Sequence, residues 1–197
     1  MSGSLAIVTG AGRGTGRAVA LALGAAGARV AAVDVNPDSA ARTAAEIGPL
    51  AAAHTADVSN KMAVQTLLYA LLEAGERLTL LVNAAHVAPG SSALTMDEWE
   101  WNRTVDVNLK GAFLMSQTVA RAMKETGGGL IVNLIRRDDS RHVAVRAARA
   151  GLEGLTQALQ TEWAPLGVRV EALGDGTDPA QTAAEVVQLC QGLWQAP

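Results

Sequence analysis

Short apolar runs alternate with longer amphipathic segments along the whole chain. The run 78–82 has the mostly apolar pattern of a buried strand. The segment 146–163 instead places Ala148, Leu152, Leu155 and Leu159 at i, i+4, i+7 and i+11, which gives a helix one apolar face. Strands are therefore expected at 5–8, 29–34, 50–58, 78–82, 130–135 and 168–173, and helices at 14–26, 37–47, 61–74, 96–123, 146–163 and 179–193.

This alternation predicts the topology of the sheet. Strands separated by helices of this length pair in parallel through right-handed crossovers. Two such halves give a three-layer α/β fold with a doubly wound, Rossmann-type parallel sheet of strand order 3-2-1-4-5-6. The sequence has no linker or internal repeat, so we expect residues 1–197 to form a single domain. Ligands of such sheets bind at the carboxyl ends of the strands, where the winding reverses.

Composition and charge exclude several classes of function. A net charge of −3 gives no sign of nucleic-acid binding. No uninterrupted run of 18 apolar residues is present, so no membrane span is expected. The single cysteine, Cys190, excludes an internal disulfide and is expected to be a small buried residue. The first strand begins near Met1 without a charged leader, which favours a cytoplasmic protein, and we expect no metal site.

A glycine-rich segment, Thr9–Gly16, lies between the first strand and the first helix. Its spacing is T-G-x-x-x-G-x-G rather than the G-x-G-x-x-G of many dinucleotide sites. Glycines bring the backbone close to a diphosphate, and a helix start supplies free N–H groups. We therefore predict that this loop holds a dinucleotide; the alternative is that the glycines only permit a tight turn. The expected contacts are Gly10, Arg13, Gly14, Thr15 and Gly16.

Two aspartates follow the second and third strands. Asp34, at the end of the second strand, could accept hydrogen bonds from the adenosine ribose and repel a 2′-phosphate, which favours NAD over NADP. Arg13 and Arg17 favour the opposite preference, and Asp34 could instead be a capping or loop residue. Asp57 could accept a hydrogen bond from the adenine amino group or serve only in a turn.

With these residues in place, the chain resembles the short-chain dehydrogenase/reductase family from Leu5 to about Gly176. The resemblance implies hydride transfer between a nicotinamide and a carbonyl or alcohol, performed by an Asn, a Ser, a Tyr and a Lys. It also implies cofactor contacts from Val58 and Asn83. The motifs that carry it are Thr9–Gly16, Asp57-Val58, Leu81–Ala85, Val105–Gly111, Gly129–Leu134 and Gly167–Val170.

Only one of the four catalytic positions of that family is kept. Asn108 matches the family Asn, whereas Arg136, Val145 and Arg149 stand where the resemblance places Ser, Tyr and Lys. Valine has no proton to give, so acid–base catalysis is lost at that position. Arg149 could still bind ribose hydroxyls, although arginine does not replace lysine. The only tyrosine, Tyr69, is expected far from the site.

Four further departures lie outside the catalytic positions. His86 replaces a family glycine near the path of the cofactor, and Asp175-Gly176 replaces a Pro-Gly. The family's substrate lid is almost absent before Pro179, and its seventh strand is missing. In the family that strand often helps to bury the edge of one subunit against another, so the assembly of subunits is expected to differ.

Three functions remain open. We favour a protein that keeps the fold and the cofactor but lacks dehydrogenase chemistry, and acts as a regulatory or assembly partner. The second is an NAD(P)-dependent oxidoreductase with a rearranged site that uses Asn108 with His142 or Ser140. The third is a structural subunit that binds no nucleotide because His86 fills the pocket.

Beyond the dinucleotide, two kinds of partner are expected. Arginines crowd the predicted catalytic region, which favours a small acidic or carbonyl ligand, although such a cluster could be solvated surface charge. A homo-oligomer is expected through the helices 96–123 and 146–163, with Trp163 as a candidate contact; the alternative is that the chain's own sheet covers this face. The clustered arginines are Arg136, Arg137, Arg141, Arg146 and Arg149.

Overall fold

The fold is built on one parallel sheet with the strand order β3-β2-β1-β4-β5-β6, as the sequence predicts. The computed structural model describes residues 4–75, 77–136, 142–176 and 178–194. Every neighbouring pair of strands is parallel. The strands are β1 (Ser4–Thr9), β2 (Arg29–Asp34), β3 (Ala51–Thr55), β4 (Arg77–Asn83), β5 (Gly129–Arg136) and β6 (Val168–Asp175).

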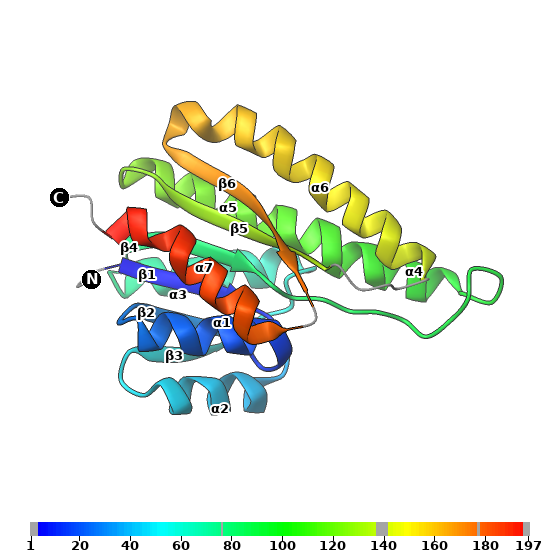
Figure 1. Ribbon diagram of the computed structural model, residues 1–197, viewed down its shortest axis with the longest axis horizontal. Coiled ribbons are helices and arrows are strands. Elements are labelled where there is room, and N and C mark those ends of the chain that lie inside the picture. Colours follow the sequence, from blue (N-terminus) through cyan, green and yellow to red (C-terminus); the bar gives the residue numbers. More distant parts are fainter. Residues whose placement is uncertain (1–3, 76, 137–141, 177, 195–197) are drawn as a thin grey trace.

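Helices cover both faces of this sheet, which confirms the three-layer α/β architecture (Figure 1). One layer contains α1 (Gly14–Ala25), α2 (Pro37–Ile47) and α7 (Pro179–Trp194). The other contains α3 (Lys61–Glu73), α4 (Glu98–Val105), α5 (Ala112–Glu125) and α6 (Val143–Trp163). The order of strands and the helix layers together create a reversal of winding between β1 and β4.

Two apolar cores lie on the two faces of the sheet. Ile7 and Leu81 point into the core beneath α3, α5 and α6, whereas Val8 and Leu80 point into the core beneath α1 and α7. Because both faces are covered, the central strands are apolar at consecutive positions, as is typical of parallel sheets. Cys190 is buried in the second core, where burial raises the pKa of its thiol to about 12.

Local signals place several helix starts. Asn36 accepts a hydrogen bond from the Ser39 N–H, and Pro37 follows at the first helical position, so α2 begins as expected. Asp97 accepts from the Glu100 N–H in the same way and starts α4 two residues later than the sequence suggests. The predicted helix 96–123 is interrupted by a π-helical segment, η1 (Asp106–Gly111), which periodicity alone does not reveal.

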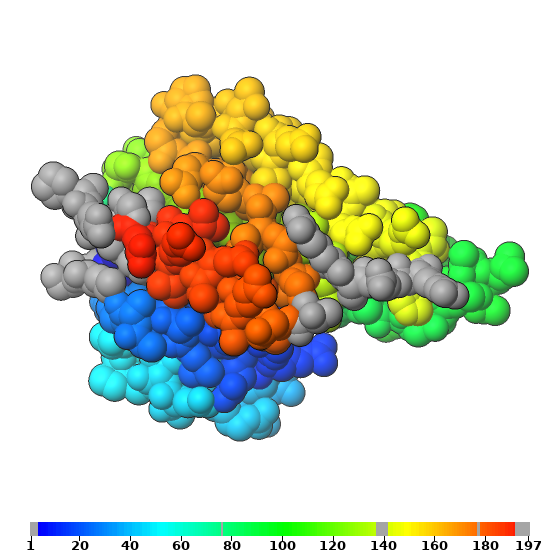
Figure 2. All heavy atoms as spheres, in the orientation of Figure 1, coloured from blue at the N-terminus to red at the C-terminus, as the bar shows by residue number. Residues whose placement is uncertain are grey.

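The segment between β4 and α4 protrudes at one end of the molecule. Figure 2 shows it in green beside the yellow start of α6. A hydrogen bond joins His142 Nδ1 and the Ser91 carbonyl oxygen at 3.2 Å. This contact places the segment along one side of the carboxyl ends of the strands, where the functional site is expected.

Candidate functional site

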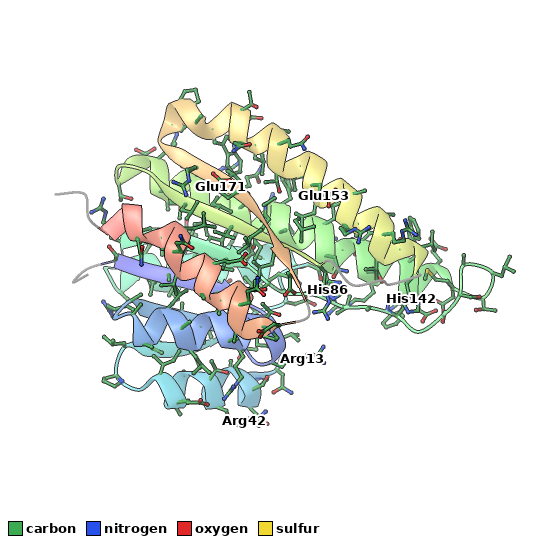
Figure 3. The ribbon with its side chains drawn as sticks, viewed as in Figure 1. Arg13, Arg42, His86, His142, Glu153 and Glu171 are labelled. Carbon is green, nitrogen blue, oxygen red and sulfur yellow. The ribbon has the colours of Figure 1, made fainter. Side chains whose placement is uncertain are left out.

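A cleft of about 470 Å³ lies at the carboxyl ends of the strands. Its walls come from the loops after β1, β2, β3 and β4, together with α4, η1 and the ends of β5 and β6. Figure 3 shows Arg13 near the start of α1 and His86 near the carboxyl ends of the central strands. The lining includes Gly10, Arg13, Gly14, Thr15, Gly16, Asp34, Asp57, Val58, His86, Arg103, Arg136 and Asp175.

Of the four glycines in the loop, Gly10, Gly14 and Gly16 have different roles. A Cβ on Gly10 would lie 2.8 Å from Ala85 Cα, and one on Gly16 would collide with the Gly10 carbonyl. These two glycines therefore allow backbone segments to pack closely. Gly14 has a φ of +54° and would point a Cβ into open space beside the cleft. Only Gly14 keeps room for a ligand by lacking a side chain.

The backbone N–H groups at the start of α1 are available to a ligand. The Ala11 N–H donates to the Val33 carbonyl, and the Gly12 N–H donates to Asp34. Within the described parts of the chain, the N–H groups of 14–16 have no acceptor. Unpaired N–H groups at a helix start, with the positive end of the helix dipole, favour a phosphate.

Asp34 lies at the end of β2 and lines the cleft. One carboxylate oxygen accepts from the Gly12 N–H at 2.9 Å, and the other accepts from the Asn36 N–H at 3.0 Å. These bonds fix the carboxylate at the edge of the cleft. Each oxygen keeps a further lone pair that a hydroxyl group could use.

Asp57 already has partners inside the protein. Its carboxylate accepts hydrogen bonds from Ser59 and forms an ion pair with Arg103 at 3.0 Å. Burial alone would raise the pKa of Asp57, but the hydrogen bonds from Ser59 and Arg103 and the charge of Arg103 hold it below the ordinary value. The sequence did not reveal Arg103, which comes from α4 and lines the same cleft.

A recess of about 30 Å³ adjoins the cleft on the side of β5 and α6. It has room for roughly two waters. It brings together all four positions that the resemblance assigned to catalysis. Those residues are Asn108, Arg136, Val145 and Arg149. The rest of its wall is mostly apolar, and Val145 itself is only 3% exposed.

Asn108 binds the loop that follows β4. Its side-chain oxygen accepts from the Val87 N–H at 2.9 Å, and its Nδ2 donates to the Val87 carbonyl at 2.8 Å. The residue lies in η1, where the π-helical turn changes the direction of the side chains. Asn108 therefore fixes the backbone of the loop after β4 at Val87.

A buried network of polar side chains lies behind the recess. Asn83 donates to Asn133 at 2.8 Å and to Ser116 at 3.0 Å, and Asn133 donates to Thr156 at 2.9 Å. All four residues are buried. The network joins β4, β5, α5 and α6, and it occupies the Asn83 amide nitrogen. Sequence reasoning included Asn83 but missed Ser116 and Thr156, whose hydroxyls lie in ordinary helical patterns.

Asp175 connects the glycine loop to the recess. Its buried carboxylate accepts from the Thr15 hydroxyl at 2.8 Å and lies 3.6 Å from an Arg136 nitrogen. The sequence marked Asp175 only as a departure from a family proline. A carboxylate at the end of an apolar strand was the available signal for this role.

Several residues singled out in the sequence lie elsewhere. Tyr69 is 70% exposed on α3, and His142 precedes α6 at the protruding segment (Figure 3). Trp163 packs in the chain's own core, so its suggested role in a subunit contact is wrong. Of the clustered arginines, Arg136 and Arg149 line the recess and Arg146 does not. Ser140, Arg137 and Arg141 lie outside the described residues.

Two features are absent from the residues that the structure describes: a membrane-spanning helix and a metal-binding cluster. Among the helices that the structure describes, none has the length and apolar character needed to cross a membrane. Among the same described residues, no group of three or more His, Cys, Asp or Glu side chains could hold a metal ion.

Comparisons with known proteins extend over nearly the whole chain. The family model for short chain dehydrogenase matches residues 4–188. The chain is 38% identical to a D-threitol dehydrogenase of Mycolicibacterium smegmatis, covering 88% of this chain and 69% of that protein. It is 34% identical to an NAD-dependent glycerol dehydrogenase of Listeria innocua, covering 86% of this chain and 68% of that one.

Solved structures show the same similarity. A metagenomic short-chain oxidoreductase in complex with NADP aligns with a TM-score of 0.90 and 32% identity, covering 96% of this chain and 91% of that one. A 3-ketoacyl-(acyl-carrier-protein) reductase from Brucella melitensis, complexed with NADH, aligns with a TM-score of 0.90 and 28% identity. That alignment covers 97% of this chain and 92% of the reductase.

Proposed function

The chain belongs to the short-chain dehydrogenase family, and we propose that it binds NAD(H) without performing the family's dehydrogenase chemistry, as a regulatory or assembly partner. The observation that carries the proposal is the buried Val145 in the recess, at the position where the family resemblance places the catalytic tyrosine. Residues 1–197 would serve as one dinucleotide-binding domain.

The shape and chemistry of the cleft support a nicotinamide dinucleotide. The N–H groups of 14–16 suit the diphosphate, and the open side of Gly14 lets the phosphates approach. Asp34 would accept from the adenosine ribose hydroxyls and disfavour a 2′-phosphate, so NAD is preferred to NADP. The nicotinamide of bound NAD(H) would be the hydride carrier that dehydrogenases of the family use. The proposed contacts are Gly10, Arg13, Gly14, Thr15, Gly16, Asp34, Asp57, Val58, Asn83 and Arg149.

The lining of the recess supports the loss of catalysis. A carbonyl group needs a proton donor within hydrogen-bond reach when it is reduced. Val145 has no proton to donate, and the guanidinium of Arg149 is not equivalent to the lysine amine of the family. Asn108 uses both side-chain polar atoms on Val87. This last family position is thereby held on a loop, with one N–H and one lone pair left over, so the case for lost catalysis depends on Val145 and Arg149.

A second function, a rearranged NAD(P)-dependent oxidoreductase, is favoured by one observation. His86 lines both the cleft and the recess. An imidazole titrates near neutral pH and could give a proton to a carbonyl oxygen. Turnover of NADH with a panel of small ketones separates the two functions. Turnover above background that disappears in His86→Ala would establish the second and exclude the first.

Assembly through α4, α5 and α6 is part of the proposal. The outer side of α6 presents exposed small residues, including Ala147, Ala150, Gly154 and Ala158, which permit close approach of another helix. Analytical ultracentrifugation tests this directly: Ala150→Arg should shift the protein to monomer, and an unchanged sedimentation coefficient would exclude this face.

A titration of intrinsic fluorescence with NAD, NADH and NADP tests cofactor binding. We expect NAD and NADH to bind more tightly than NADP, and Gly14→Val to abolish binding because its side chain enters the cleft. Gly75→Val is the matched control, since Gly75 has a φ of +74° and equally open surroundings but does not line the cleft. Both variants should lose about 1–2 kcal/mol of stability from backbone strain. No binding at millimolar cofactor would exclude the proposal.

A further inference from the structure

Among the residues that the structure describes, the recess contains a cation without a counterion. Arg149 reaches it from α6 and is half-buried. None of these described residues forms a hydrogen bond or an ion pair with the Arg149 guanidinium. A charged group partly removed from water is unfavourable unless an opposite charge approaches it. The described lining of the recess therefore leaves an electrostatic requirement unmet.

The nearby carboxylate does not meet this requirement. Asp175 is the acidic residue in the lining of the recess, and its two oxygens are engaged by Thr15 and Arg136. Among the described residues, the recess lining carries two guanidinium groups and one carboxylate, with His86 beside them. Because Asp175 pairs with Arg136, this described lining leaves the charge of Arg149 in excess.

A bound dinucleotide would not neutralise Arg149 either. Ribose hydroxyls can accept hydrogen bonds from a guanidinium, but they carry no charge, and five N–H donors leave several unused. The diphosphate would lie at the start of α1, in the cleft. The cleft lining includes the glycine loop but not Arg149, and the recess lining includes Arg149 but not the three loop glycines.

We propose that the recess is a carboxylate site, in which Arg149 binds the carboxylate of a small organic acid beside the cofactor. A guanidinium presents a planar fork of donors that matches the two oxygens of a carboxylate. The volume of about 30 Å³ limits the buried part of the ligand to a group the size of acetate, and the rest of a larger acid would extend into the cleft. The apolar wall of Ile135, Val145 and Leu152 suits the carbon next to the carboxylate.

This inference rests on the proposed function, because the ligand enters beside bound NADH. The test is a titration of the NADH-loaded protein with acetate at constant ionic strength, followed through the arginine Nε–H signals by NMR. We expect acetate to shift the Arg149 signal and to bind at least tenfold more tightly than acetamide, which has the same shape without the charge. Equal affinities for acetate and acetamide would overturn the proposal.

Variants assign the effect to Arg149. Arg149→Gln should reduce acetate affinity at least tenfold, whereas Arg149→Lys should retain part of it. Arg146→Gln is the matched control, because Arg146 is exposed on the same helix and does not line the recess. Unchanged acetate affinity in Arg149→Gln would exclude the site.

Two further arms complete the design. Chloride in place of acetate should leave the Arg149 signal unmoved; an equal response to chloride would show a general anion site and overturn the carboxylate assignment. NADH affinity is measured in parallel by fluorescence. If the wild type does not bind NADH, the proposed function is wrong. If it binds NADH but shows no response to acetate, only this inference is wrong.

Discussion

The cleft and the recess lie side by side at the same edge of the sheet, yet they are built differently. The part of the cleft expected to hold a diphosphate is formed by backbone: open N–H groups at a helix start and glycines that permit close approach. The recess is formed by side chains from β5, η1 and α6. The first has the features of a dinucleotide site, whereas the second has valine and arginines at the positions where the family resemblance leads us to expect catalytic groups.

This difference explains how the cleft and the recess of one site can diverge independently. A backbone site depends on the turn that creates it, and only a few positions can spoil it by gaining a Cβ. A side-chain site depends on the identity of each residue in its wall. Under the proposed function, a single substitution such as that at Val145 would remove chemistry from the recess while the neighbouring cleft keeps its shape.

The largest expected effect comes from restoring the family residues in the recess. Arg136→Ser, Val145→Tyr and Arg149→Lys together should give NADH oxidation with a small ketone at least ~10²-fold above the wild type, because general acid catalysis contributes about that much. The added bulk at 145 should cost about 1–3 kcal/mol of stability. Spectrophotometric turnover and thermal unfolding measure the two effects.

The control for this triple variant carries Phe instead of Tyr at position 145. It adds nearly the same volume without a hydroxyl, so it should lose stability equally and remain inactive. The comparison between cleft and recess fails if the wild type already turns over ketones as fast as the triple variant.

A second prediction separates the roles of the glycines in the cleft. Gly16→Ala should destabilise the protein by about 3 kcal/mol, more than Gly14→Ala, because its Cβ collides with the Gly10 carbonyl. Gly14→Ala meets no atom within 4 Å and should cost only about 1–2 kcal/mol from its positive φ, while it weakens NADH binding at least tenfold. Calorimetric unfolding and NADH titration test both. Equal loss of stability in the two variants would contradict the assignment.

A third prediction concerns the choice of cofactor. Asp34→Asn keeps an oxygen acceptor for the Gly12 N–H but removes the negative charge. The ratio of NADP to NAD affinity should rise about tenfold, equivalent to about 1.4 kcal/mol. Fluorescence titrations with both dinucleotides measure the ratio, with the exposed Asp38→Asn as the control. An unchanged ratio would show that Asp34 does not contact the ribose.

The smallest expected effect is the dependence of stability on pH at Asp57. Hydrogen bonds from Ser59 and Arg103 hold its pKa below the ordinary value of 3.8. A carboxylate with a lowered pKa stabilises the fold above the pKa of the unfolded chain, and this contribution is lost as the pH falls through the folded pKa. Unfolding free energies measured from pH 5 to pH 2 should therefore fall less in Asp57→Asn than in the wild type. Glu73→Gln, at an exposed position, should follow the wild type.

The sequence predicted the sheet order, the helix layers and the glycine loop because these follow from local patterns. Apolar runs and capping residues such as Asn36 are readable one segment at a time. The interruption at 106–111 was not predicted. A π-helical turn leaves the apolar pattern of the sequence unchanged and alters only the directions in which the side chains point. The sixth strand extends further than expected, to Asp175, because it stays paired with β5 as far as Arg136.

Contacts between distant residues explain what else the sequence could not give for the site. The pairing of Asp57 with Arg103 joins positions 46 residues apart, and that of Thr15 with Asp175 joins positions 160 apart. Such partners depend on the packing of whole elements, and no local pattern marks them. The meeting of Asn108, Arg136, Val145 and Arg149 was foreseeable only through the family resemblance.

The polar network behind the recess has a consequence for protein engineering. Asn83, Ser116, Asn133 and Thr156 hold two strands and two helices at fixed spacing through bonds that do not involve Arg136, Val145 or Arg149. Those last three residues, which line the recess, can therefore be substituted without breaking the hydrogen bonds of this network. The fold is therefore a suitable scaffold on which new ligand specificities can be selected, one wall position at a time.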